Sequence, residues 1–179
     1  SLHAHQQNLI VSKYEEKKFE ALEDIYISLI STSNARLNLK EFDNLFGFNE
    51  GDEFLYEYFK AYAHTFDEYD KAFKNITSAY KTIEENAIYI DAEIEREINT
   101  ALGVILSHYI SQHKELKITQ KTAQKLYHDK LLSKNNAPLN FKQFYDTSSA
   151  NWKNTANPVK HKIKSVIREI LTPTPKNVT

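Results

Sequence analysis

The clearest pattern of hydrophobic and polar positions lies between residues 55 and 83. Apolar and aromatic side chains recur there at alternating spacings of four and three residues: Leu55, Phe59, Tyr62, Phe66, Tyr69, Phe73, Ile76, Tyr80 and Ile83. A repeat of about 3.5 residues predicts one helix with a continuous apolar stripe, which we call the 55–83 stripe. At a rise of 1.5 Å per residue it is about 40 Å long, so we expect the other helices to pack along it.

Turn residues mark both ends of this long helix. The sequence Asn49-Glu50-Gly51-Asp52 predicts a turn with Asp52 as the N-cap, and the helix is expected to run to about residue 85. Residues 86–90 predict a tight turn, and Asp91 is a natural N-cap for the next helix. The alternative is one unbroken helix with a phase shift near Ile94.

The part of the chain before this helix predicts one long helix and one short one. The first is expected from His3 to about Ser31, with an apolar side formed by Ile10, Tyr14, Ala21, Leu22, Ile25 and Leu29. A short helix at about 39–46, with Gly47 as its C-terminal cap, is expected to close one end of the structure.

The part after residue 91 predicts four further helical segments. The first covers 92–113, and the second covers about 120–134 with Thr119 as its cap. A short helix follows near Phe141. The last helix is expected to begin at Asn157-Pro158 and to end near 171, with residues 172–179 as a mobile tail.

Composition agrees with an all-α fold. Three glycines and four prolines in 179 residues are too few for the turns of a β-rich protein. We therefore expect a single domain over 1–179, built as an up-and-down helical bundle of about four main helices plus two short ones. The absence of cysteine excludes disulfides, thiolate metal sites and a cysteine nucleophile.

The start of the chain and its hydropathy bear on its cellular context. The chain begins Ser1-Leu2-His3, which suggests a processed N-terminus or a vector remnant at residues 1–2. We therefore expect the soluble part of a larger protein with a membrane anchor outside this chain, and we favour a cytoplasmic location. The longest uncharged stretch, Ile98–His113, has 16 residues, which is short for a membrane span, and it contains polar side chains.

Charge is distributed unevenly along the chain. Residues 52–97 hold five Lys or Arg against twelve Asp or Glu, whereas residues 114–179 hold thirteen against four. Either the basic third of the chain, residues 114–179, packs on its acidic middle, residues 52–97, or the basic third faces an anionic partner. Lys160, Lys164 and Arg168 share one helix face and are the candidate anion or partner surface, although nucleic acid is a poor fit because arginine is scarce.

The histidines offer little support for a metal centre. None has an acidic residue three positions before it, which excludes the di-iron bundle motif. His64 and Glu68 supply two ligands at most, fewer than a structural zinc site needs. His108 lies on the core side of its helix, where we expect a neutral, hydrogen-bonded imidazole.

One set of residues is similar in order to a known family of enzymes. His108, His113, His128-Asp129 and Asp146 follow the His…His-Asp…Asp order of the HD metal-dependent phosphohydrolases, which are also helical. The resemblance covers these isolated residues only. The flanking sequence lacks the small apolar and glycine residues of that family, and Lys130 beside the proposed ligands disfavours a dication. We expect no metal, no cofactor and no catalytic residues.

The remaining sequence features favour binding over catalysis. No glycine-rich phosphate loop, nucleophile elbow or metalloprotease helix occurs. The leading hypothesis is a non-enzymatic interaction or regulatory module that binds an unknown protein partner or a second copy of itself. One alternative is a small-molecule sensor with a pocket near Tyr62 and Tyr69, between the second and third helices. The other is an anionic-surface binder that uses the last helix.

Overall fold

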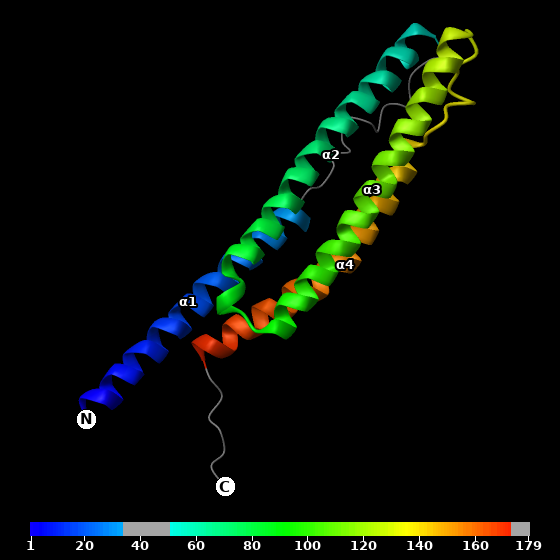
Figure 1. The fold of residues 1–179 in the computed structure, drawn as a ribbon. Helices are drawn as coiled ribbons and strands as arrows, with labels where there is room; N and C mark the ends of the chain where they lie inside the picture. The colour runs from blue at the N-terminus through cyan, green and yellow to red at the C-terminus, as the bar shows by residue number, and fades with distance from the viewer. Residues whose placement is uncertain (34–50, 173–179) are drawn as a thin grey trace.

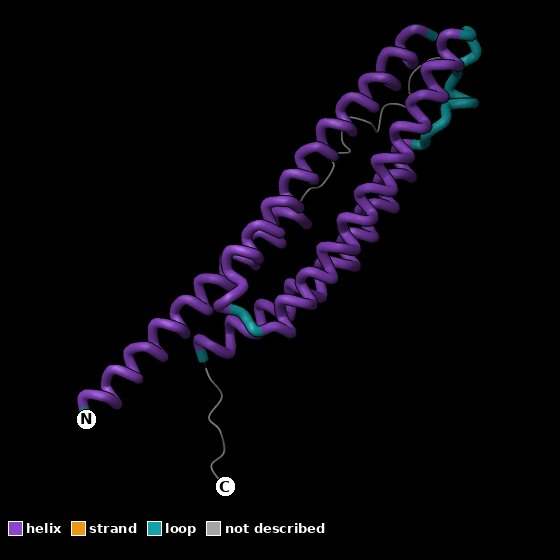
Figure 2. Tube along the Cα trace, in the orientation of Figure 1, coloured by secondary structure: helices purple, strands orange, loops and turns teal. Residues whose placement is uncertain are grey.

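The computed structural model describes residues 1–33 and 51–172 (Figure 1). It contains four α-helices and one short 3₁₀ helix in this part of the chain: α1 Leu2–Ser33, α2 Asp52–Asn86, η2 Ala87–Tyr89, α3 Ala92–His128 and α4 Phe141–Leu171. Helices and their connections account for every described residue, and none of them lies in a strand (Figure 2).

The four helices form an up-and-down bundle. Successive helices run in opposite directions (Figure 1), and each of them packs on two neighbours: α1 and α3 both contact α2 and α4. The predicted all-α bundle is therefore confirmed. The short helix expected at 39–46 and residues 173–179 of the expected tail lie outside the described residues.

α1 packs along the second half of α2. The Thr32 hydroxyl donates to the Asn75 carbonyl at 3.4 Å, and the Ser28 hydroxyl donates to that of Thr82 at 3.2 Å. Lys18 marks the end of this contact, with its ammonium group 3.2 Å from the Asp91 carboxylate. Residues before it continue as helix past the end of the bundle (Figure 1).

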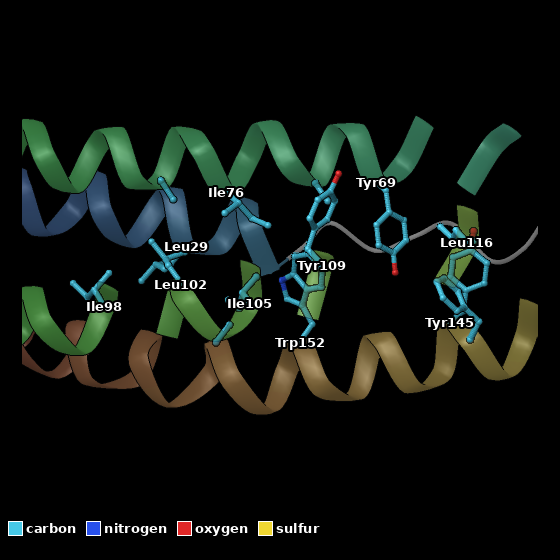
Figure 3. Packing of buried hydrophobic residues seen from close by; sticks show 14 of the residues in the cluster. Leu29, Tyr69, Ile76, Ile98, Leu102, Ile105, Tyr109, Leu116, Tyr145 and Trp152 are labelled. Atoms are coloured by element: carbon cyan, nitrogen blue, oxygen red, sulfur yellow. The ribbon is translucent and has the colours of Figure 1, made fainter. Parts of the chain in front are cut away.

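Beyond the C-terminal end of α1, tyrosine rings fill the core. α2 and α4 lie across a diagonal of the bundle, so long side chains are needed to bridge them. Tyr62 packs edge-on against Phe141 with ring centroids 4.9 Å apart, and Tyr69 lies 5.9 Å from Phe144. Aliphatic residues such as Leu29 and Ile98 fill the section that contains α1, as Figure 3 shows.

The 55–83 stripe coincides with the buried face of α2 at only some of its positions. Of the predicted positions, four are fully buried: Tyr62, Tyr69, Ile76 and Ile83. The other buried positions include small residues that the pattern missed, namely Ala61, Thr65, Ala72 and Ala79. Large rings at the remaining stripe positions lie at the edge of the core, where Phe66 packs on His113 and Phe73 stacks on Tyr109 of α3.

The break predicted between 113 and 120 is wrong. α3 is continuous through this segment, and Thr119 is an interior residue whose hydroxyl donates to the Glu115 carbonyl at 2.9 Å. A threonine can bond back in this way and remain helical, so it is an ambiguous cap signal. The segment also lacks glycine and proline, and Leu116 is fully buried within it.

The helix start predicted at Asn157-Pro158 is also wrong. α4 is one helix from Phe141 to Leu171, with Pro158 in its interior. Its actual N-cap is Asn140, whose side-chain oxygen accepts a hydrogen bond from the Gln143 backbone N–H at 3.1 Å. Asn140 and Gln143 have the spacing of a capping box, which is the sequence signal that would have located this end.

The predicted break between α2 and α3 is confirmed, with altered cap details. Residues 87–89 form η2, and Asp91 occupies the N-cap position of α3 without a side-chain cap hydrogen bond. Its carboxylate pairs with Lys18. Asp52 is the first residue of α2 rather than its cap, and Gly51 caps the helix with a φ of 137°. Glycine tolerates this positive φ without strain.

Candidate functional site

Tyr62 and Tyr69, the predicted pocket residues, are packed inside the core. They are 0% and 1% exposed, and both hydroxyls are engaged there. The Tyr62 hydroxyl lies 3.3 Å from that of Tyr58, and the Tyr69 hydroxyl donates to the side chain of Gln112. Both side chains therefore fill the core of the bundle, and a ligand pocket near them stays a prediction.

A buried polar cluster ties three helices together at this level. Gln112 of α3 accepts hydrogen bonds from Tyr69 of α2 and, at 2.7 Å, from Ser148 of α4. Next to it, the hydroxyls of Thr65 and Tyr145 are 2.7 Å apart. Burial raises the pKa of Tyr145 to about 12, despite the opposing effect of the Thr65 hydrogen bond, and burial also raises the pKa of Tyr69. Both rings stay neutral near pH 7. The hydrogen bonds of the cluster join α2, α3 and α4 at fixed positions and therefore set the register of these helices.

Tyr58 anchors the connection between α3 and α4. Its hydroxyl accepts from the backbone N–H of Leu139 at 2.9 Å and donates to the carbonyl of the same residue at 3.2 Å. These bonds satisfy backbone groups that the adjacent helices leave unpaired, and Leu139 itself is buried. The connection is therefore held against the start of α2.

The predicted basic surface lies on the second half of α4. Lys164 and Arg168 are exposed, and Lys160 is half-buried. Their neighbour Lys162 contacts the acidic start of α3, with its ammonium group 2.6 Å from Glu97. This hydrogen bond raises the pKa of Lys162. At least one lysine of the basic third thus lies on the acidic middle of the chain, and binding of an anionic partner by the other three stays a prediction.

The residues that resemble the HD phosphohydrolase order are dispersed. His128 ends α3, and its side chain is exposed, as is that of Asp146. His113 packs on Phe66, whereas His108 faces Trp152 across a pocket. In residues 1–33 and 51–172, no group of three His, Asp or Glu side chains is placed to hold a metal ion.

The first half of α1 presents the most unusual surface of the described molecule. We define the α1 arm as residues 1–17, all of which are exposed. Three apolar side chains stand out: Ile10 is 68% exposed, Val11 60% and Tyr14 45%. Tyr14 contacts Tyr89 of η2, with ring centroids 6.3 Å apart.

The α1 arm continues the core-facing side of its helix. Val11, Lys18, Ile25 and Thr32 are spaced seven residues apart and therefore share a face. Ile25 and Thr32 are fully buried in the bundle. The prediction that Ile10 and Tyr14 lie on the apolar side of α1 fits this face, but burial of the face ends before the arm. Sequence periodicity indicates which side is apolar, and it does not show how far the other helices reach.

No helix in the described ranges is long and apolar enough to cross a membrane, and the expectation of a membrane-anchored parent stays a prediction. No protein-family model, no curated protein and no solved structure matches this chain.

Proposed function

We propose that this chain is a non-enzymatic helical interaction module and that the α1 arm is its docking element. The observation that carries the proposal is the continuation of a buried helix face into an arm that the described bundle leaves uncovered. The polar groups of the core support the same view, because Tyr69, Gln112 and Ser148 bond to one another. They are engaged in holding the helices together.

Energetics favour a partner for the α1 arm. Most helical stability in proteins comes from packing of an apolar face, and the described bundle leaves this face of the arm uncovered. Full burial of a large apolar side chain stabilises by about 1.5–3 kcal/mol. Ile10, Val11 and Tyr14 are roughly half exposed or more, so covering each would contribute on the order of 1 kcal/mol.

A second copy of this chain is the occupant to which we commit. The exposed apolar residues Ile10, Val11 and Tyr14 lie on one side of the arm, and this patch is complementary to itself when two arms run antiparallel. An antiparallel pair centred between Val11 and Tyr14 places Val11 of each copy on Tyr14 of the other. The contact is small and the cost of association offsets much of the gain, so we expect a weak dimer with a Kd of about 1 mM or above.

Sedimentation equilibrium over a protein range of about 50 µM to 1 mM tests this proposal, because it reaches the concentrations at which so weak a dimer is populated. We expect a concentration-dependent dimer that Val11→Glu converts to a monomer, since the carboxylate would be buried in the contact. Tyr56→Glu is the matched control, because Tyr56 is a 68% exposed ring on α2, away from the arm. A chain that is monomeric throughout, or a dimer that persists unchanged in Val11→Glu, would refute the docking role of the arm.

A further inference from the structure

A row of lysine side chains runs along the solvent side of the second half of α3. Four exposed lysines follow one another at spacings of three, four and four residues: Lys114, Lys117, Lys121 and Lys125. With about 100° of rotation and a rise of 1.5 Å per residue, they lie within an arc of about 80° over a length of about 16 Å. We call this row the α3 basic stripe. It lies opposite Leu116, which is fully buried in the bundle.

The α3 basic stripe is not neutralised within residues 1–33 and 51–172. None of its four lysines forms an ion pair with an Asp or Glu side chain there. Glu115, the one acidic residue between Lys114 and Lys125, lies about 100° round the helix from Lys114 and borders α4 beside Gln143. Lys117, Lys121 and Lys125 are like-charge neighbours four residues apart, which destabilises a helix. This part of the surface therefore carries uncompensated positive charge.

Two exposed apolar side chains flank the stripe. Ile110 is 57% exposed and Ile118 is 55% exposed. By the same helical geometry each lies about 40° from Lys114, so isoleucines and lysines share one solvent-facing side of α3. A single exposed isoleucine is ordinary on a protein surface. Apolar side chains combined with a row of lysines on one side of a helix are typical of surfaces that contact a membrane interface.

The neighbouring helices leave the stripe accessible. The residues of α4 that border α3 along this stretch are uncharged and exposed: Gln143, Thr147, Asn151 and Asn154. On the α2 side, the His113 ring packs on Phe66. Burial and then the positive charge of Lys117 lower the pKa of His113, while Asp70 opposes the shift. The stripe is thus bordered by uncharged side chains on the side of α4 and by a neutral ring on the side of α2.

We infer that the α3 basic stripe docks on an anionic membrane surface. Charge complementarity supports this partner, because the stripe presents four ammonium groups without a countercharge to negatively charged lipid headgroups. Ile110 and Ile118 then enter the boundary between headgroups and acyl chains. The helix lies along the membrane surface, with its buried side still packed in the bundle.

The composition of the stripe favours lipid headgroups over nucleic acid. A lysine ammonium group is a point charge that imposes no fixed geometry on its partner, which suits a fluid layer of headgroups. Recognition of nucleic-acid phosphates favours the planar guanidinium group of arginine, and binding of single strands also uses aromatic rings on which bases stack. The segment 114–125 contains neither arginine nor an aromatic residue.

The α3 basic stripe is separate from the other two surfaces described above. The basic surface predicted from the sequence lies on α4, and the α1 arm lies on α1, so the membrane contact stands or falls independently of the dimer. The attraction of one lysine to an anionic leaflet corresponds to about fivefold in binding. Three lysines therefore correspond to about a hundredfold, which is large enough to measure with variants.

Co-sedimentation of the full chain with sucrose-loaded vesicles tests the inference. We compare vesicles of pure phosphatidylcholine with vesicles that contain about 30% phosphatidylserine, each at about 50 mM and about 300 mM salt. We expect binding to the phosphatidylserine vesicles at low salt and at least about tenfold weaker binding at the higher salt, because salt screens the attraction. The neutral vesicles should bind at least about tenfold more weakly than the anionic ones.

Matched charge variants locate the contact. The triple variant Lys117→Gln, Lys121→Gln, Lys125→Gln removes three charges while keeping good helix formers, and we expect vesicle binding to weaken at least about tenfold. The control variant Lys153→Gln, Lys164→Gln, Arg168→Gln removes the same charge from exposed positions of α4 and should weaken binding less than about threefold. Thermal melting checks that both are folded, and the α3 variant should melt no lower than the unchanged protein, since it loses like-charge pairs.

A second pair of substitutions tests the apolar part of the contact. Ile110→Gln combined with Ile118→Gln keeps every charge of the stripe. We expect at least about threefold weaker binding to the phosphatidylserine vesicles, because two side chains no longer enter the interface.

Four results would overturn the inference. The first is the absence of binding to phosphatidylserine vesicles at low salt. The second is equal binding by the α3 variant and the α4 control, which would make net charge alone responsible. The third is binding that is unchanged by the two isoleucine substitutions, which would mean that the helix does not reach the interface. The fourth is tighter binding of a single-stranded oligonucleotide that is lost in the α3 variant, which would assign the stripe to nucleic acid.

Discussion

Replacing Pro158 with alanine distinguishes a continuous α4 from a helix that starts at that residue. Proline in a helix interior costs about 3 kcal/mol, because it removes one hydrogen bond and its ring clashes with the preceding turn. Pro158 is exposed, so Pro158→Ala removes no core contact and restores an N–H to the Asn154 carbonyl. Alanine also gives the unfolded chain more conformational freedom than proline does, which lowers the free energy of unfolding by about 1 kcal/mol.

The restored hydrogen bond outweighs the added freedom of the unfolded chain. We expect a net stabilisation of about 2 kcal/mol, which for a chain of this size raises Tm by roughly 4–8 °C. Differential scanning calorimetry or circular dichroism at 222 nm measures it. Pro138→Ala is the control, because Pro138 lies in the connection before α4, outside a helix, and no helical hydrogen bond is gained there. An unchanged or lower Tm for Pro158→Ala would mean that the last helix begins at Pro158.

Three further predictions concern the core and the surface. Gln112→Leu leaves the hydroxyls of Tyr69 and Ser148 without their acceptor, so the free energy of unfolding should fall by about 2–4 kcal/mol in urea titrations; a loss below about 0.5 kcal/mol would contradict the cluster's role. Because the folded-state pKa of Tyr145 is raised to about 12, its contribution is complete below pH 10 and is lost as the unfolded tyrosine ionises above it. Between pH 10 and about pH 12 the stability should therefore fall by about 1.4 kcal/mol per pH unit for this tyrosine, and the NMR ring signals of Tyr145 should remain those of a neutral phenol while the fold is intact; ionisation of the Tyr145 ring in the intact fold near pH 10 would disprove this. Lys162→Ala removes a partly exposed ion pair and should lower Tm only slightly, with the difference vanishing in high salt; a salt-independent loss would point to packing.

The sequence determined the fold class and the positions of most helices. The scarcity of glycine and proline and the long period-3.5 pattern predicted an all-α bundle, and α2 ends within a residue of its predicted boundaries. The turn near residue 90 was also readable, because β-branched and aromatic residues precede Asp91 there. Local signals were sufficient in these cases because tertiary contacts agree with them.

Ambiguous local signals failed where tertiary packing decided the outcome. Thr119 and Pro158 both resemble helix boundaries, yet each lies inside a helix whose buried residues continue on both sides. Leu116 and Ala123 hold α3 together across the first, and Ala156 and Ile163 hold α4 together across the second. Burial of a continuous apolar face outweighs a single unfavourable residue.

The surfaces proposed for binding depend on where helices end relative to one another. Hydrophobic periodicity assigns Tyr14 to the apolar side of α1, and it contains no information on whether another helix reaches that far. His108 and Trp152 each have a ring nitrogen without a partner among the described residues, and this depends on which residues face them across the α3–α4 interface. The sequence by itself determined helices and their apolar sides. Only the tertiary structure decided which apolar and polar groups stay without a partner, because that follows from the lengths and offsets of packed helices.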